Sequence, residues 1–129
     1  MKGFVEGIED LTQNNEDYRR VLYTGKHLQL VLMALQPGEQ IGEEVHETHD
    51  QFFRVEDGEG EVWIDGAKTP IEDDDAVIVP AGARHNIVNT GKTPLKLYTL
   101  YAPPEHRFDV RHPTKADETE EHFDGRTTE

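Results

Sequence analysis

The stretch from residue 37 to residue 101 most constrains the fold, because short apolar runs alternate there with Gly, Pro and Asp turn signals. Runs of this length predict β-strands, and many short strands with closely spaced turns predict an antiparallel sandwich or barrel. Asp65-Gly66 is typical of a tight hairpin turn. The expected strands cover residues 51–55, 61–64, 68–71, 76–79, 85–88 and 95–101.

Two further strands are expected upstream, at residues 18–23 and 28–35, joined by a glycine-containing loop of hairpin length. The second run, LQLVLMAL, is apolar at nearly every position. Such a strand is buried on both faces or lies at a subunit contact, and a homodimer is therefore expected.

The 129 residues fit one domain, which divides into three parts. A polar N-terminal segment (1–17) precedes the barrel (18–104), and an acidic tail (105–129) follows it. Thr114 is a candidate N-cap for a short helix in the tail, reaching to Glu121. The N-terminal segment has no apolar run of signal-peptide length, so a cytoplasmic location is expected.

The balance of 27 acidic and 13 basic residues gives a formal net charge of −14. This charge repels phosphate backbones and anionic lipid, so neither nucleic acid nor a membrane is an expected partner. An ordinary acidic protein and one adapted to high salt are equally compatible with it. The chain has no cysteine, so any metal must be held by imidazole, carboxylate or amide groups.

Two segments concentrate such groups. His85 follows a turn made by Pro80 and Gly82 after an apolar strand, which fixes its position and suits a metal ligand. Upstream, Glu44 and His46 are two residues apart and face the same side of a strand.

His49 needs a turn to join Glu44 and His46. Gln51 places a polar amide at the end of the apolar stripe that Phe53 and Val55 continue. A polar site capping a packed barrel is expected from this arrangement.

Together these segments resemble the two signature motifs of the cupin superfamily over about residues 28–101. In the second motif Pro80, Gly82, His85 and Asn89 match, while Asp74 stands where the family has a glycine. In the first motif, six residues separate Gln51 from Gly58, so Gln51 occupies the position of the family's glutamate.

Counting back from Gln51 places His46 at the second histidine of the first motif and Glu44 at the first. The resemblance therefore implies an all-β, single-domain cupin, a double-stranded β-helix or jelly-roll barrel. It implies one divalent transition metal, zinc, nickel, manganese or iron, held by Glu44, His46, Gln51 and His85. His49 is an alternative to Glu44 or Gln51.

The chain looks like the group of small cupins labelled mannose-6-phosphate isomerase-like. Three functions follow as hypotheses. The metal acts as a Lewis acid on a small carbonyl or sugar-like ligand, in an isomerase-like or a dioxygenase reaction, with Glu47 as a candidate proton carrier. Alternatively, the chain is a non-catalytic metal or small-ligand binding module, or a dimerisation domain with a vestigial site.

Other polar residues are expected to have structural roles. Four arginines are candidates to position an anionic ligand, with surface ion pairing preferred: Arg19, Arg20, Arg54 and Arg84. Two tyrosines, Tyr98 and Tyr101, are expected to pack in the core with a solvated tip; a hydroxyl at the barrel mouth for acid–base work is the alternative. The tail histidines are expected to be solvated, with docking near the metal as the alternative: His106, His112 and His122.

Overall fold

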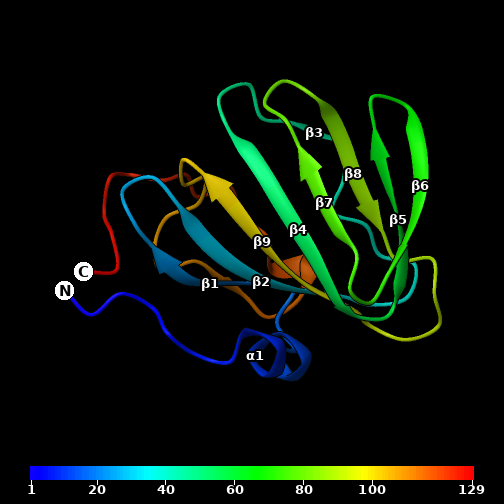
Figure 1. Ribbon diagram of the computed structural model, residues 1–129, viewed down its shortest axis with the longest axis horizontal. Coiled ribbons are helices and arrows are strands. Elements are labelled where there is room, and N and C mark those ends of the chain that lie inside the picture. The colour runs from blue at the N-terminus through cyan, green and yellow to red at the C-terminus, as the bar shows by residue number, and fades with distance from the viewer.

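Two antiparallel sheets form the body of the computed structural model, which describes residues 1–129 (Figure 1). One has six strands in the order β10-β1-β2-β9-β4-β7, and the other has four in the order β3-β8-β5-β6. The strands are β1 (Arg19–Thr24), β2 (Gln29–Leu35), β3 (Glu44–Val45), β4 (Asp50–Asp57), β5 (Glu59–Ile64), β6 (Ala67–Glu72), β7 (Ala76–Val79), β8 (Arg84–Val88), β9 (Leu95–Ala102) and β10 (Arg111–His112). There are two short helices, α1 (Ile8–Asn14) and the 3₁₀ helix η1 (Lys115–Asp117).

The strands expected from the sequence are all present, with ends that differ by at most two residues. Asp65 and Gly66 link β5 to β6 with φ angles of 48° and 85°. Positive φ at both central residues is what a two-residue hairpin of type I′ requires. The prediction of an all-β, single-domain jelly roll is confirmed.

The core lies between the two sheets, where alternate residues of each strand point inward. In β2, β4 and β9 these inward residues include Val31, Met33, Phe53, Val55 and Leu97, each at most 1% exposed. Burial of this continuous apolar layer is the main source of stability for a chain of this size.

Strand β2 is buried on both faces within one chain. Leu32 and Ala34 alternate with the core residues, yet they are 1% and 2% exposed. The Ala34 backbone N–H donates to the carbonyls of Asp17 and Tyr18, and α1 contacts β4 and β9 of the same sheet. The apolar character of β2 therefore does not require a subunit contact, and it no longer supports the homodimer by itself.

Helix α1 was not expected from the polar N-terminal segment. Gln13 fixes it to the sheet: its side-chain amide donates to the Glu56 carbonyl at 3.2 Å, and Lys96 donates to its backbone carbonyl at 2.7 Å. Thr12, a residue of the helix itself, is fully buried. A seven-residue helix is marginal in isolation, so tertiary contacts decide its presence.

Neither helix is long and apolar enough to cross a lipid bilayer.

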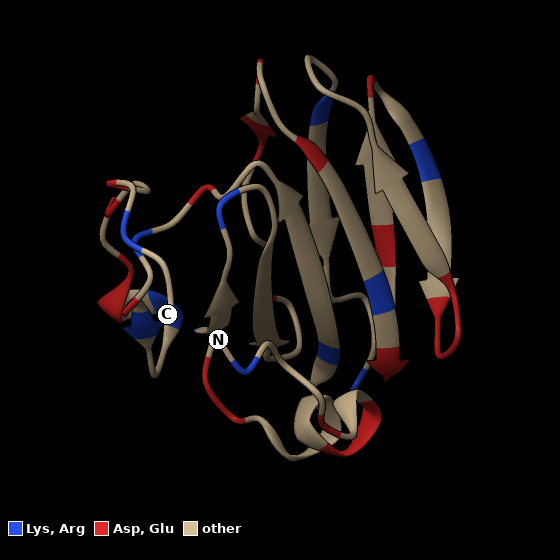
Figure 2. Cartoon of the chain, turned by 60° about the vertical axis from the view of Figure 1, so that its left-hand side comes forward, with Lys and Arg blue, Asp and Glu red and all other residues tan.

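The C-terminal segment, residues 105–129, packs against the barrel instead of forming a free tail. β10 pairs with β1, and Val110 is buried at 3% exposure. Thr114 does begin a helix, with its hydroxyl donating to Asp117 at 2.8 Å, but the helix ends at Asp117 and does not reach Glu121. Figure 2 shows Asp and Glu in α1, on several strands, in loops and in this segment.

Gly58 provides a test of the first cupin-like motif. Its φ is +92°, and a Cβ there would lie 2.6 Å from the Pro94 carbonyl oxygen. We expect Gly58→Ala to lower the free energy of unfolding by about 3 kcal/mol, since backbone strain and steric overlap add.

Gly38 is the matched control. Its φ is +83°, but a Cβ there meets no atom within 4 Å. We expect Gly38→Ala to cost about 1 kcal/mol, the strain alone. Urea unfolding of both variants measures the difference, and equal losses would mean that the contact with Pro94 contributes nothing.

Candidate metal centre at the barrel mouth

Three of the four predicted ligands converge at the barrel mouth. Glu44 on β3 and His85 on β8 are register partners on neighbouring strands, and His46 follows directly after β3. One ligand atom from each of the three lies within 4.8 Å of the other two. The Gly82 N–H donates to the His46 carbonyl at 2.9 Å, which ties the turn before β8 to the first motif.

The local geometry suits a shared cation. Nε2 of His46 lies 3.0 Å from Oε2 of Glu44, the separation expected of neighbouring ligands that each lie about 2.0–2.2 Å from one ion. Nδ1 of His85 lies 3.1 Å from the Ala83 carbonyl oxygen. Donation to this carbonyl fixes the ring and leaves Nε2 with its lone pair directed elsewhere, as in metal-binding histidines.

Glu44 and His46 each shift the pKa of the other. Burial opposes ionisation of Glu44, but the hydrogen bond with His46 and the positive charges of His46, Arg19 and His85 lower its pKa below the ordinary value. The hydrogen bond with Glu44 raises the pKa of His46, against the effect of burial. Each of the two side chains therefore stabilises the charged form of the other.

Gln51, the fourth predicted ligand, is on β4 in the opposite sheet and is 3% exposed. Its amide nitrogen donates to the Thr99 hydroxyl at 3.1 Å, while its buried Oε1 has no hydrogen-bond partner. Buried polar atoms are rarely unpaired, so this oxygen is a free acceptor inside the barrel. The residues present therefore fit a divalent ion, with nitrogen and oxygen donors of the kinds that zinc, nickel, manganese and iron accept.

His49 does not join Glu44 and His85. Its ring lies 5.8 Å from that of His46, and its Nε2 lies 3.0 Å from the Pro104 carbonyl and 3.3 Å from Glu105. His46, His49 and Glu105 form a second group whose ligand atoms lie within 4.8 Å of one another. His49 thus lies beside the first group and belongs with Glu105, so the geometry favours Glu44 over His49 as the partner of His46 and His85.

Glu105 is the residue that sequence reasoning missed. It was assigned to the acidic tail, yet its side chain is 14% exposed and contacts His49, His46 and His122 at 3.3, 3.8 and 3.3 Å. No sequence motif marks it, because the fold of the C-terminal segment alone brings it to the mouth. Glu47, the proton carrier suggested by the sequence, is exposed and belongs to neither group.

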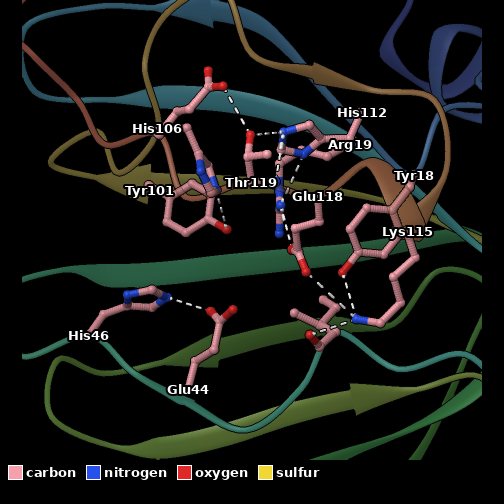
Figure 3. A network of polar contacts seen from close by, with 12 residues as sticks. Tyr18, Arg19, Glu44, His46, Tyr101, His106, His112, Lys115, Glu118 and Thr119 are labelled. Carbon is pink, nitrogen blue, oxygen red and sulfur yellow. Dashed lines mark hydrogen bonds and ion pairs between the residues drawn. The ribbon is translucent and has the colours of Figure 1, made fainter.

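A cavity of about 520 Å³ opens beside Glu44 and His46, and His85 is not part of its lining. Glu44 and His46 contribute to one part of its lining, and residues of the C-terminal segment, from Glu105 to His122, form much of the rest. Figure 3 shows Glu44 and His46 facing this segment and the side chains that it carries.

Two expectations about the tail histidines are wrong. His112 is 4% exposed, and burial lowers the pKa of His106 to about 2, so both are far from solvated. Nε2 of His106 lies 3.3 Å from the Tyr101 hydroxyl. His122 matches the expectation in part, because its side chain is 69% exposed while it contacts Glu105.

Of the tyrosines and arginines considered above, Tyr101 and Arg19 lie near the site and the others do not. Tyr101 is buried with its ring edge-on to His46 at 5.9 Å, whereas Tyr98 stacks near Phe52 on the outer face, away from the mouth. Arg54 makes ion pairs with Glu56 and Asp74, in line with the structural role expected of it.

Arg84 lies 4.0 Å from Glu43, and Arg20 is exposed. Arg19 differs, because its side chain is only 3% exposed and lines the cavity. The expected surface role of Arg19 is therefore wrong.

Fold and site together define a one-domain double-sheet barrel with a histidine and carboxylate cluster at its mouth. The cupin domain family matches residues 31–101, more than half of the chain. The chain belongs to the cupin family.

The similarity extends to individual proteins. A crystal structure of BH2720 from Bacillus halodurans has a TM-score of 0.88 and 48% sequence identity, covering 90% of this chain and 92% of that one. The uncharacterized protein YrkC of Bacillus subtilis is 49% identical over 122 residues, which cover 90% of this chain and 66% of YrkC, just under two thirds of its length. Mannose-1-phosphate guanylyltransferase of Escherichia coli is 30% identical over 73 residues, 57% of this chain and 15% of that enzyme.

The shifted pKa values of His46 and Glu44 predict how the affinity for a metal ion depends on pH. The raised pKa of His46 means that a proton must leave Nε2 before it can bind a cation, whereas Glu44, with its lowered pKa, stays ionised in the same range. We expect the affinity for Ni²⁺ to fall about tenfold per pH unit below the pKa of His46, since one proton competes. Calorimetric titration at pH 5.5, 6.5 and 7.5 measures this, and a constant affinity would contradict it.

Proposed function

We propose that this cupin binds one divalent transition metal through Glu44, His46, Gln51 and His85, for action on a small carbonyl or sugar-like ligand in the adjacent cavity. The observation that carries the proposal is the convergence of Glu44, His46 and His85 within 4.8 Å beside a cavity large enough for a small molecule. The unpaired Oε1 of Gln51 supports its role as the fourth ligand.

An ion held there supplies Lewis-acid polarisation of a ligand carbonyl or hydroxyl. The chain supplies the proton-handling groups. Glu105 lines the cavity with a carboxylate that is positioned by three histidines and is placed to accept a proton. Burial raises the pKa of Tyr101, so its hydroxyl keeps its proton and serves as a hydrogen-bond donor beside His106.

A carbonyl polarised next to a carboxylate suits an isomerase-like proton transfer better than a dioxygenase reaction. The similarity to mannose-1-phosphate guanylyltransferase, an enzyme named for a sugar phosphate, supports a sugar-like ligand. A non-catalytic metal or small-ligand binding module is the second candidate. It is favoured by the origin of the cavity lining, which comes mostly from the C-terminal segment and includes only two of the four proposed ligands, Glu44 and His46.

Ligand substitutions test the metal centre. We expect His85→Ala to weaken Ni²⁺ binding by about 100-fold or more, because even the partners of metal ligands are worth about 10–100-fold. Gln51→Glu, which restores a carboxylate, is expected to strengthen binding, while Gln51→Ala weakens it. Calorimetry and elemental analysis of the purified protein provide the measurements.

His27→Ala is the matched control, because His27 is exposed and outside both histidine groups. Wild-type protein that binds no transition metal in either assay would refute the proposal and favour a dimerisation domain with a vestigial site. Equal effects of His85→Ala and His27→Ala would remove His85 from the ligand set.

We also propose a homodimer formed through the outer face of the six-stranded sheet. Four apolar residues are register partners across neighbouring strands there: Leu30, Leu100, Phe52 and Ile78. Ile78 is 69% exposed. The chain is strongly acidic, so two copies repel each other over most of their surfaces. This row carries no charge, and the repulsion between two copies is therefore smallest there.

We expect Ile78→Glu to convert a dimer into a monomer, as measured by light scattering at micromolar concentration. Val5→Glu is the control, since Val5 is 91% exposed but lies in the N-terminal segment. A monomeric wild-type protein would refute the dimer.

A further inference from the structure

Arg19 is a buried cation whose hydrogen-bonding capacity is only partly used. Its Nη1 donates to Oε2 of Glu118 at 2.7 Å and lies 3.4 Å from Nδ1 of His112. Its Nε is buried and has no hydrogen-bond partner. A guanidinium presents its donors as a planar fork, so one full edge of this fork, Nε with Nη2, makes no hydrogen bond to the protein.

Arg19 lies in the wall of the cavity beside the proposed metal ligands. Arg19 begins β1 and lines the same cavity as Glu44 and His46. In Figure 3, Arg19 and Glu118 lie on the side of the cavity opposite Glu44 and His46. A small ligand bound to an ion at Glu44 and His46 would share this cavity with Arg19.

Arg19 already binds a carboxylate, that of Glu118. Its carboxylate reaches Arg19 from η1's C-terminal end, and its other oxygen lies 3.8 Å from Nζ of Lys115. This carboxylate belongs to a segment that is held to the barrel by β10 and by backbone hydrogen bonds on either side of Glu118. Displacement of Glu118 therefore requires only that its side chain turn away from Arg19. A carboxylate thus already occupies the place beside Arg19.

We infer that Arg19 is the residue that recognises the ligand, and that the ligand is a small carboxylate, such as an oxo acid or a sugar acid. Glu118 occupies the carboxylate subsite when no ligand is bound and is displaced on binding. The inference rests on the proposed function, since it assigns the end of the ligand that lies away from the metal.

The charge of the cavity favours a monoanion over a phosphate. Arg19 is the one Lys or Arg among the 11 lining residues. Five lining residues are acidic: Glu44, Glu105, Glu118, Glu120 and Glu121. The charge of a bound ion is the same for either ligand, and Arg19 is the only Lys or Arg side chain that adds to it. A dianionic phosphate would therefore add one more negative charge than a carboxylate does, whereas a monocarboxylate that replaces Glu118 leaves the local charge unchanged.

Nickel-loaded protein provides the test, titrated by calorimetry with four monocarboxylates: pyruvate, acetate, glycolate and lactate. Hydroxyacetone, a neutral carbonyl compound of similar size to pyruvate, and inorganic phosphate are the comparison ligands. Nickel affinity is measured first for every variant, so that loss of the metal site is separated from loss of the carboxylate subsite.

We expect Arg19→Lys to weaken carboxylate binding at least about tenfold, because lysine keeps the charge but loses the planar fork. Glu118→Gln, which removes the competing charge with little change in shape, is expected to strengthen it several-fold. Arg20→Gln is the matched control, because Arg20 is exposed on the same strand. Hydroxyacetone binding is expected to be the same in all variants.

The two substitutions thus have opposite expected signs, which a purely structural role for the Arg19–Glu118 pair does not give. If Arg19→Lys fails to fold, the Glu118→Gln result decides the question. The inference is overturned if wild-type and Glu118→Gln proteins bind nickel but none of the four carboxylates. It is also overturned if Glu118→Gln does not strengthen binding, or if phosphate binds as tightly as the carboxylates. Failure of the wild-type protein to bind nickel would instead refute the proposed function.

Discussion

The pairing of β3 with β8 is the constraint on which the candidate metal centre depends, because it sets Glu44 directly opposite His85. β3 is only two residues long, so two contacts outside the strand support it. The Gly82 N–H donates to the His46 carbonyl, and the Asn86 side chain donates to Gln40. A slip of one residue would turn Glu44 away from the interior and leave His85 without its neighbour.

The second dependence links the C-terminal segment to the cavity. Arg19 is a buried cation, and such a charge is costly unless another group compensates it. Glu118 provides the compensating charge, and His112 on β10 contacts the same nitrogen. Packing of residues 105–122 against the barrel is therefore coupled to the charge state of the cavity, and the segment also delivers Glu105 to the histidines.

Much of the barrel could be predicted from the sequence because its signals are local. Strands with alternating burial, the Asp65-Gly66 hairpin and the positive φ at Gly58 and Gly82 each depend on a few neighbouring residues. Helix α1 and the folded C-terminal segment were missed for the opposite reason. Their residues are polar, and their order comes from contacts such as Lys96 with Gln13 and β10 with β1, which join distant parts of the chain.

By itself, the sequence determined the strand positions and the motif spacing that nominated Glu44, His46, Gln51 and His85, because period-two alternation and fixed turns are properties of short segments. Only the tertiary structure decided that Glu44, His46 and His85 converge, that His49 pairs instead with Glu105, and that Arg19 is buried facing them. The physical reason is that burial and charge pairing depend on which distant side chains share a space, and Glu118 lies 99 residues beyond Arg19 in the chain.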